Sequence, residues 1–347
     1  MKKYFIALFL SIILTMACTQ TRAENNKSVE AGVETTNYEI IVVDNTLEDP
    51  AIIIGGHRTK YTSRDISDTF FIITIGEGES ADFSGIEQFQ NTRHLRLRLL
   101  DIRDLDFSPL RSLPYLESMF ILGWGLATFP DLDGIPSLIG LDIDFGRLTN
   151  LNGIEKIPSL ERLVISENRM PLTDMSALRY LRNLKSLHLY SGFYTIDFSV
   201  LEDLLKLKEL WIGAGGEVDL TGISQAKSIE KLILQSNVSR NMDERSVYKN
   251  IAEIGKMTEL KELHLDESIS SVEYLADNVN LERLELIADM ERMDYGEVLL
   301  PLDVKPLGNL TKLKYLAIRG FELTNADVLE GLPRLKYFST RSSPHDH

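Results

Sequence analysis

The sequence predicts a solenoid of the α/β class, in which short parallel strands stack side by side into one long sheet. Two observations support this prediction. A set of apolar residues with the spacing apolar–x–x–apolar–x–apolar occurs twelve times between Phe70 and Phe338, the last time incompletely. Successive sets are separated by 21 to 24 residues in nine of the eleven intervals. A period of this length is typical of proteins in which each repeat packs only against its neighbours.

Each apolar triplet is expected to form one strand. Its second and third members lie two residues apart, so both point to the same side of the strand and into the core, and the residues between them point outward. Leu163 is therefore expected in the core and Val164 on the surface. The triplets are Phe70-Ile73-Ile75, Thr92-Leu95-Leu97, Leu116-Met119-Ile121, Leu138-Leu141-Ile143, Leu160-Leu163-Ile165, Leu184-Leu187-Leu189, Leu207-Leu210-Ile212, Ile229-Leu232-Leu234, Leu260-Leu263-Leu265, Leu281-Leu284-Leu286, Leu313-Leu316-Ile318 and Leu335-Phe338.

The most regular repeat, residues 148–165, has the sequence LTNLNGIEKIPSLERLVI. It closely resembles the 22-residue leucine-rich repeat of bacterial internalins, and the resemblance covers roughly residues 70–340. It implies a right-handed solenoid of about 11–12 repeats, with a concave parallel β-sheet and short helices or irregular segments on the convex side. The family places an asparagine three residues after the last strand residue. Only Asn168 and Asn237 match, so the remaining turns are expected to be irregular or adapted by glycine.

Two long intervals, of 31 and 32 residues, contain insertions. In residues 243–256, Val247, Ile251 and Ile254 share one helical face, so a helix on the convex side is predicted there. Residues 289–304 have no clear period and are expected to form a protruding loop. Before the repeats, residues 38–44 and 51–54 are rich in β-formers. We expect residues 38–69 to cap the exposed edge of the first repeat.

The N-terminus has the features of an export signal. Lys2 and Lys3 precede thirteen almost entirely apolar residues, 4–16. That run is shorter than the roughly 20 residues a membrane-spanning helix needs, and it suits the apolar core of a signal peptide. It ends at Ala17-Cys18, which resembles the cleavage box of bacterial lipoproteins.

The resemblance implies a signal peptide at 1–17, lipidation of Cys18 and a polar tether over 18–37. Thr15 departs from the usual aliphatic residue of the box. Ordinary secretory cleavage after Ala23 is the alternative. Residues 341–347 are predicted to be a solvated tail.

The composition restricts the classes of function. The net charge of −15 argues against binding nucleic acid, and against docking on anionic lipid through a basic patch. A single cysteine excludes a disulfide within this chain. His188 and His264 are expected three strands apart, too far to share a metal ion. The sequence contains no catalytic motif, so the protein is not expected to be an enzyme or to need a cofactor or metal.

The outward-facing strand positions supply the candidate binding residues. Phe120, Tyr190 and Trp211 are aromatic, a type enriched at binding hot spots. Trp124 is expected in a turn beside them, and His188 offers a polar group that can change charge in mildly acidic conditions. The other candidates, expected to orient a partner, are Arg96, Arg98, Asp142 and Asp144. Four further residues of alternating sign are expected to form a self-neutralising ladder, namely Glu209, Lys231, Glu262 and Arg283.

These features lead to a functional hypothesis. The chain is expected to be a membrane-anchored or secreted bacterial leucine-rich-repeat protein that binds a protein through its concave face, in adhesion or host interaction. The alternative is a scaffold lipoprotein acting between bacterial proteins. The expected location is the bacterial cell envelope, with a lipid anchor and no nucleic-acid partner. The identity of the ligand is not encoded in any motif.

Overall fold

The structure is a computed structural model of the whole chain, which divides into two units, Met1–Thr36 and Asn37–His347. All described residues belong to the second unit. They are residues 39–42, 51–52, 70–75, 83, 86–88, 90–99, 105–123, 126–144, 146–166, 168, 170–190, 197–214, 216–236, 247–266, 269–288 and 299–340. The predicted signal peptide, Cys18, the whole of the predicted tether 18–37 and the tail 341–347 lie outside them.

A 14-stranded sheet dominates this unit. Strands β1 (Glu39–Val42) and β2 (Ala51–Ile52) are antiparallel, and β1 pairs with the first of a continuous parallel series. The parallel strands, in spatial order, are β3 (Phe70–Ile75), β4 (His94–Leu99), β5 (Ser118–Gly123), β6 (Gly140–Asp144), β7 (Arg162–Ser166), β8 (Ser186–Tyr190), β9 (Glu209–Ala214), β11 (Lys231–Ser236), β13 (Glu262–Asp266), β14 (Arg283–Ile287), β16 (Tyr315–Arg319) and β18 (Tyr337–Ser339). Each predicted triplet contributes to one of these strands, so the predicted solenoid and its parallel sheet are confirmed.

The core lies behind the sheet, where successive repeats stack. Leu163 and Ile165 of β7 are 0% and 1% exposed, as the strand alternation requires. Ile154 and Ile157 from the return segment of the same repeat are also buried and close the other side. The apolar residues of one repeat are thus covered only when its neighbours are in place.

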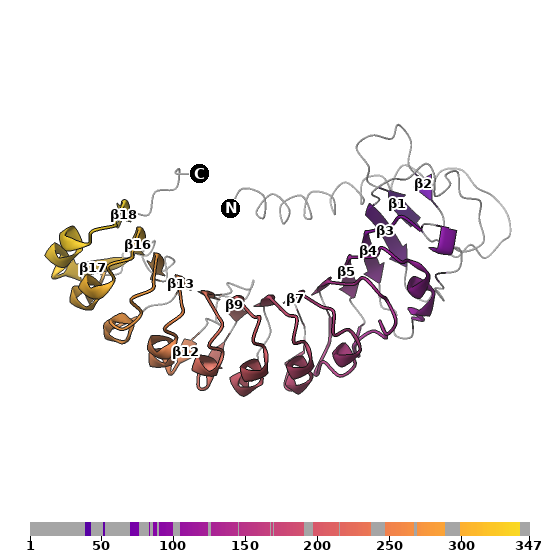
Figure 1. Cartoon of the computed structure of the whole chain (residues 1–347), viewed down its shortest axis with the longest axis horizontal. Coiled ribbons are helices and arrows are strands. Elements are labelled where there is room, and N and C mark those ends of the chain that lie inside the picture. The colour runs from indigo at the N-terminus through magenta and orange to yellow at the C-terminus, as the bar shows by residue number, and fades with distance from the viewer. Residues whose placement is uncertain are drawn as a thin grey trace. The chain divides into compact units, whose positions relative to one another are not determined.

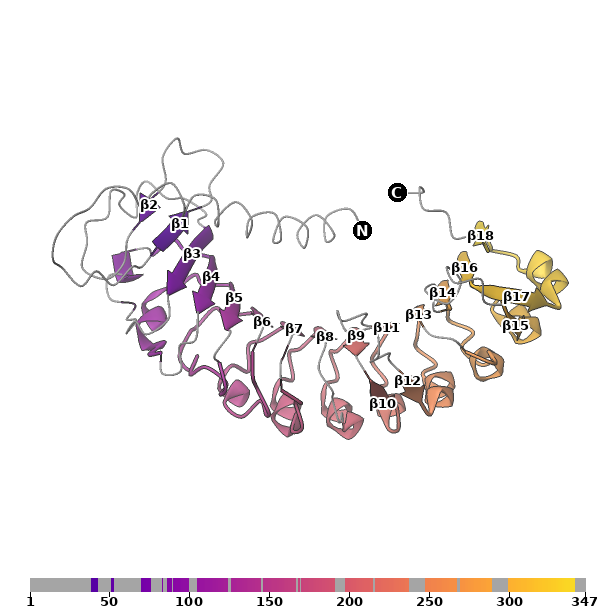
Figure 2. The same cartoon turned by 180° about the vertical axis from the view of Figure 1, so that it is seen from behind.

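Short 3₁₀ helices form the return segments. The strands line the inner side of a curved stack and these helices its outer side (Figure 1), and Figure 2 shows the same arrangement from behind. The helices are η2 (Ile86–Gln88), η3 (Ser108–Ser112), η4 (Ile154–Lys156), η5 (Ser176–Tyr180), η6 (Phe198–Asp203), η7 (Ile223–Gln225), η8 (Ile251–Lys256), η9 (Glu273–Leu275), η10 (Lys305–Asn309) and η11 (Ala326–Gly331). No helix among the described residues has the length and apolar character needed to cross a membrane.

Aspartates cap many of these turns. The carboxylate of Asp197, for example, accepts a hydrogen bond of 3.0 Å from the backbone N–H of Ser199. Asp106, Asp174, Asp219 and Asp303 accept the same bond from the residue two positions later. Hydrogen bonds to the ionised form lower the pKa of all five carboxyls. Part of the chain's acidity therefore serves to close its convex turns.

The register of the first triplet was predicted wrongly. The structure pairs Phe71 with Leu95 and Ile73 with Leu97, whereas the sequence pattern matched Ile73 to Leu95. Five of the six residues of β3 are apolar, so no polar alternation marks the register there. A shift of two residues keeps each side chain on its expected face.

The first insertion forms a helix only in the second half of the predicted segment. Its described part contains strand β12 (Val247–Lys249), parallel to β10 (Glu217–Asp219), followed by η8. Tyr248 is buried, and its hydroxyl lies 3.1 and 2.9 Å from the carbonyl oxygens of Ile212 and Gln235, so its one proton is shared between these two acceptors. Val247 is 48% exposed instead of sharing a buried face with Ile254. The buried tyrosine of this extended segment, which the helical pattern ignored, ties it to two strands of the main sheet.

The second insertion also differs from its prediction. β15 (Leu300–Asp303) pairs in parallel with β17 (Phe321–Thr324), and both Leu302 and Val304 are 0% exposed. The end of the predicted protruding loop is therefore part of the packed convex layer. Residues 289–298 lie outside the described part.

The predicted asparagine is used once among the described residues. Asn168 is buried; its side-chain oxygen accepts from the backbone N–H of Leu148 at 2.9 Å and its amide donates to the Leu148 carbonyl at 2.7 Å. Elsewhere, polar side chains connect repeats at the opposite edge, just before the strands. Asn183 donates to the carbonyl of Pro158 at 3.0 Å, and Asn280 to that of Thr258 at 2.8 Å. Asn237 lies outside the described residues.

Candidate functional site

The structure brings most of the predicted binding residues into one line on the concave face. Neighbouring members are Cα partners on consecutive strands from β4 to β9. We call this line the concave row; its members are Arg96, Phe120, Asp142, Val164, His188 and Trp211. Because adjacent strands lie about 4.8 Å apart, neighbouring side chains in the row are in contact range.

Three rings pack together at the end of the row. Trp211 lies with its ring centroid 5.3 Å from that of His188 and 5.0 Å from that of Tyr190, and the Tyr190 ring meets it nearly edge-on, at 66°. We call His188, Tyr190 and Trp211 the aromatic cluster. All three are partly exposed, so the cluster keeps apolar surface available on the concave face. The prediction that they share one face is correct, but they cover one another more than the sequence indicated.

Gly213 makes room for this packing. It is the Cα partner of Tyr190 on the neighbouring strand, and a Cβ at this position would lie 3.1 Å from Cδ1 of the tyrosine ring. This distance is tighter than an ordinary contact, so a side chain at position 213 would require the ring to shift by a few tenths of an ångström. The glycine therefore allows the close approach of Tyr190 to β9.

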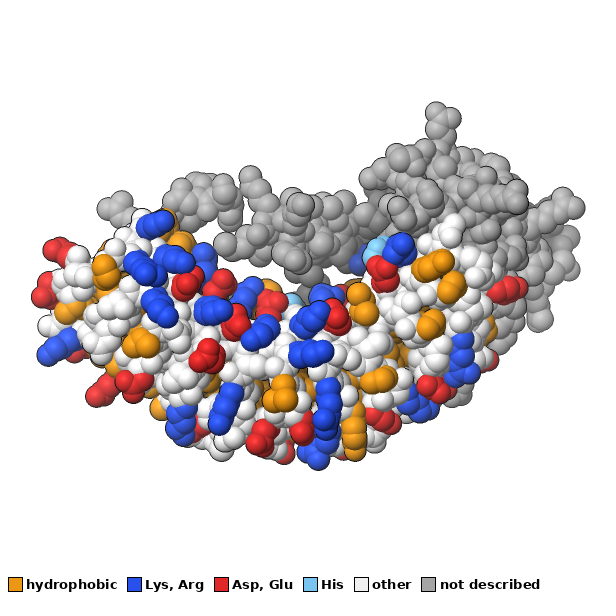
Figure 3. Space-filling model, viewed as in Figure 1, with side chains coloured by type: hydrophobic (Ala, Val, Ile, Leu, Met, Phe, Trp, Pro, Cys, Tyr) orange, Lys and Arg blue, Asp and Glu red, His pale blue; other side chains and the backbone are white. Residues whose placement is uncertain are grey.

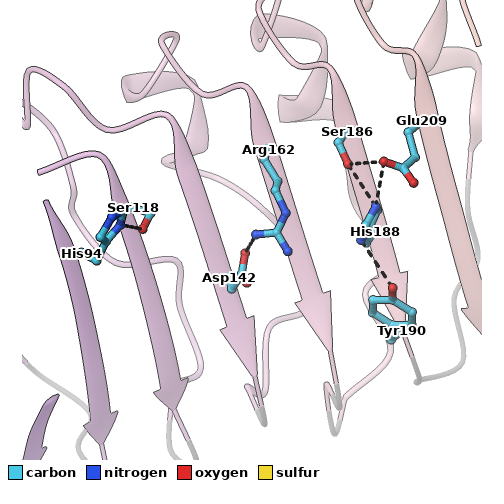
Figure 4. A network of polar contacts seen from close by, with 8 residues as sticks. All are labelled: His94, Ser118, Asp142, Arg162, Ser186, His188, Tyr190 and Glu209. Carbon is cyan, nitrogen blue, oxygen red and sulfur yellow. Dashed lines mark hydrogen bonds and ion pairs between the residues drawn. The ribbon is translucent and has the colours of Figure 1, made fainter. Parts of the chain in front are cut away.

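Polar groups hold the histidine of the cluster. The Ser186 hydroxyl lies 3.0 Å from Nε2 of His188, and Oε2 of Glu209 lies 3.7 Å from the same nitrogen (Figure 4). Oε1 of Glu209 also pairs with Nζ of Lys231 at 2.7 Å. The contact with His188, followed by that with Lys231, outweighs burial and lowers the pKa of Glu209 to about 2. Burial raises the pKa of Tyr190, so its phenol stays neutral.

The other half of the concave row joins charge to an aromatic ring. The guanidinium of Arg96 lies over the Phe120 ring, 4.2 Å from its centroid, a cation–π arrangement. Asp142 pairs with Arg162 of the next strand (Figure 4). Burial raises the pKa of Asp142, and the neighbouring Arg162 opposes that rise. Asp144, two residues on, accepts from the Ser166 hydroxyl at 3.0 Å.

Val164 corrects the surface prediction. It occupies the outward position as expected, but it is only 7% exposed. Its neighbours in the row are Asp142 and His188, and the Arg162–Asp142 ion pair crosses between its own strand and β6. A valine between such longer side chains is covered by them. The middle of the concave row is therefore packed.

Half of the predicted charge ladder is formed. Glu209 pairs with Lys231, but Arg283 pairs with Glu285 of its own strand and places its guanidinium 3.8 Å from the centroid of the Tyr315 ring. Burial opposes ionisation of Glu285, but a 3.1 Å contact with His264 and the nearby Arg283 outweigh it and lower its pKa to about 2.

Two residues of the site, and two that were predicted, remain to be placed. Arg162 and Ser186 were missed. The signal was present, because both occupy the outward strand position two residues before the row. Trp124 lies outside the described residues. The backbone of Arg98 is part of β4 opposite Leu122, and its side chain lies outside the described part.

The arrangement suits contact and does not suit a nucleophilic relay. In such a relay the hydroxyl and the carboxylate contact opposite nitrogens of the imidazole. Here Ser186 and Glu209 both face Nε2, while the hydroxyl of Tyr190 lies 3.4 Å from Nδ1. Among the described residues, no group of three or more His, Cys, Asp or Glu side chains could hold a metal ion.

One buried donor in the cluster has no acceptor within the part of the chain that the structure describes. The indole Nε1 of Trp211 is buried without a hydrogen-bond partner among the described residues. Leaving such a donor unpaired costs about 1–3 kcal/mol. Unpaired buried groups of this kind are uncommon in folded proteins and therefore require an explanation.

Comparisons with known proteins support the fold. No protein-family profile matches the sequence. A homologue of a regulatory inhibitor subunit of protein phosphatase 1, from Arabidopsis thaliana, is 31% identical over 153 residues, which are 43% of this chain and 45% of that protein. This chain thus spans less than half of that relative's length.

Two solved structures extend the comparison. A chain of the mouse RP105/MD-1 complex aligns with a TM-score of 0.58 and 16% identity, over 77% of this chain and 46% of its own length. An internalin from Listeria monocytogenes aligns with a TM-score of 0.43 and 18% identity, over 78% of this chain and 87% of its own. The parallel sheet and the first of these likenesses show that the chain has the leucine-rich-repeat fold.

Proposed function

We propose that this chain is a protein-binding module of the bacterial cell envelope, and that its concave row contacts the partner in adhesion or host interaction. The observation that carries the proposal is the aromatic cluster, in which Tyr190 and Trp211 keep partly exposed rings on the concave face. Aromatic side chains with restricted motion are the usual anchors of protein interfaces.

The rigidity of the site supports binding. Each residue of the row is held by a strand that pairs on both sides, and Tyr190 is further positioned by Gly213 and Trp211. A surface ordered before binding loses little conformational entropy when the complex forms.

The similar proteins point to the same class of ligand. The matched Arabidopsis protein is named as a homologue of a regulatory inhibitor subunit of protein phosphatase 1, and the mouse chain belongs to a complex of two proteins. Both descriptions refer to work with a protein partner. We extend this class of ligand, but neither specific partner, to the present chain.

The envelope location rests on the N-terminal sequence, where Lys2, Lys3 and a short apolar run precede Ala17-Cys18. We propose that Cys18 carries a lipid anchor. A Cys18→Ala variant should lose labelling by a fatty-acid probe and leave the membrane fraction. Recovery of wild-type protein as a soluble species beginning at Glu24 would contradict the anchor and favour ordinary secretion.

Site-directed photo-cross-linking tests the binding face. A photoreactive residue replaces either Phe120 in the concave row or Tyr180, a 58% exposed residue of η5, in the full chain. Cross-links to a partner protein are expected from position 120 and not from position 180. Cross-links from position 180 alone would move the binding site off the concave face.

A further inference from the structure

A second surface is present at the edge of the sheet where the strands begin. In each repeat it consists of three residues around the first apolar member of the triplet. They are the two residues that precede this member and the one residue that follows it. From the repeat of β8 to that of β18, these positions hold ten basic and three acidic residues, a surplus of seven positive charges in a chain of net charge −15. We call this surface the cationic flank. Its basic residues are Arg182, Lys185, Lys206, Lys208, Lys227, Lys261, Lys312, Lys314, Arg334 and Lys336, and all are exposed.

The flank is one continuous surface. The backbone N–H of Lys208 donates to the carbonyl of Lys185 at 2.9 Å, and the equivalent bond links each later repeat to the one before it, ending with Lys336 to Lys314 at 2.9 Å. At about 4.8 Å per strand, six steps span roughly 29 Å. In Figure 3 a row of Lys and Arg side chains runs from the middle of the stack toward the C-terminal repeats.

Internal ion pairs consume only part of this charge. Lys208 and Lys261 share the single carboxylate of Glu230, each at 2.7 Å. Lys185 and Lys314 each pair with one glutamate. Several of the remaining basic residues make no ion pair with any residue that the structure describes, among them Arg182, Lys227 and Lys336. The flank thus presents uncompensated positive charge along its length.

Aliphatic side chains stand among these cations. Leu205 is 78% exposed and directly precedes Lys206, and Val279 is 45% exposed in the turn before β14. Both occupy the first flank position of their repeats, where most residues are polar, charged or proline. The flank therefore combines a line of positive charge with isolated aliphatic residues at turn tips.

We propose that the cationic flank docks onto an anionic membrane surface. Each basic residue near anionic headgroups adds electrostatic attraction, and an isolated Leu or Val at a turn tip can enter the headgroup region without a matching pocket. An acidic protein would need both a line of carboxylates over the same length and separate pockets for Leu205 and Val279. The negative net charge of the chain does not prevent docking through this surface, because the flank itself carries a surplus of seven positive charges. The proposal does not depend on the concave row or on the anchor at Cys18.

Vesicle binding by the full-length chain tests the proposal. Partitioning is measured on vesicles of phosphatidylcholine alone and on equimolar phosphatidylcholine and phosphatidylglycerol. An acyl chain or an apolar N-terminal segment inserts into both kinds of vesicle. The ratio of the partition coefficient on the anionic vesicles to that on the neutral vesicles therefore reports the electrostatic contribution. We expect Arg182→Glu, Lys227→Glu, Lys336→Glu to lower that ratio at least about tenfold, and Leu205→Ser to weaken binding to the anionic vesicles.

A matched triple variant controls for overall charge. Arg147→Glu, Arg179→Glu, Lys305→Glu makes the same change in net charge at exposed residues outside the flank, and it should leave the ratio within about twofold. Replacing Tyr190 and Trp211 by alanine should also leave it unchanged, so failure of the concave site and failure of the flank are distinguishable. Equal effects of the two triple variants, or equal binding of wild type to both vesicle compositions, would overturn the proposal.

Discussion

The concave row and the cationic flank lie on the same repeats, a few residues apart, yet they treat charge in opposite ways. In the row, each described carboxylate has its own partner: Asp142 faces Arg162, and in the adjoining cluster Glu209 faces His188 and Lys231. In the flank, Lys208 and Lys261 share one glutamate, and several other cations, among them Arg182, Lys227 and Lys336, have no ion-pair partner among the described residues. The row therefore leaves apolar ring surface to a partner, and the flank leaves charge.

The difference shows how a repeat separates two kinds of recognition. Outward-facing side chains at strand positions have neighbours on the strands at both sides and are partly buried by them. A charged group there destabilises the fold unless it is paired. Side chains that precede the strand sit at an edge open to water and keep their charge at little cost. The two surfaces suit different partners.

The largest expected effect on stability comes from introducing an aspartate, and it depends on how deeply the position is buried. Leu163→Asp buries a charge at a position with 0% exposure and should cost about 4 kcal/mol or more of unfolding free energy. Val164→Asp sets a second carboxylate beside Asp142 at a 7% exposed position and should cost about 1–3 kcal/mol. Ile139→Asp, at a 41% exposed edge position, should change stability by no more than about 0.5 kcal/mol.

Urea unfolding followed by circular dichroism measures all three. Equal losses for Leu163→Asp and Val164→Asp would mean that the two faces of the strand are equally packed. That outcome would contradict the register of β7.

The same positions explain how far the sequence could predict the fold. Leu163 was assigned correctly because the triplet pattern repeats over many strands. Val164 was assigned to the surface because alternation gives the direction of a side chain and not the length of its neighbours. The extended backbone of β12 was missed because Val247, Ile251 and Ile254 fit a helical period, whereas the packing of Tyr248 decided the structure.

The candidate site shows a similar limit. Phe120, His188, Tyr190 and Trp211 could be placed on one face from the strand pattern alone. The ring contact between Tyr190 and Trp211 could not, since it depends on how side chains of two different strands pack together, with Gly213 leaving room beside the tyrosine. The cationic flank was hidden by the total charge of the chain, which sums residues that the fold keeps on separate surfaces.

A smaller loss of stability is expected from removing one carboxylate beside the concave row, that of Glu209, or one on the flank, that of Glu282. The pKa of Glu209 falls from 4.5 to about 2 in the folded chain, so its ionised form is favoured by folding. That stabilisation is complete above about pH 4.5 and disappears as the pH falls through about 2. Glu209→Gln should therefore be less stable than wild type by about 1.5 kcal/mol at neutral pH, with the difference vanishing near pH 2.

Glu282→Gln provides the comparison on the flank. Its carboxylate pairs with Lys314 in an exposed position, where solvent and salt weaken the attraction. The urea midpoints of the two variants and of wild type, measured between pH 2 and 7, compare the stability lost in Glu209→Gln with that lost in Glu282→Gln. A pH-independent difference between Glu209→Gln and wild type would contradict the role given to its ionised form.

The central claim is that the aromatic cluster of the concave face is the protein-binding surface. The most direct test is the affinity of a Tyr190→Ala, Trp211→Ala variant for the partner captured by cross-linking. Its control is Tyr115→Ala, Tyr180→Ala, which removes two aromatic rings that are 53% and 58% exposed away from the concave row. With the fold retained by circular dichroism, we predict a loss of at least about tenfold in affinity for the cluster variant, about 1.4 kcal/mol, and no change for the control. An unchanged affinity in the cluster variant would contradict the claim.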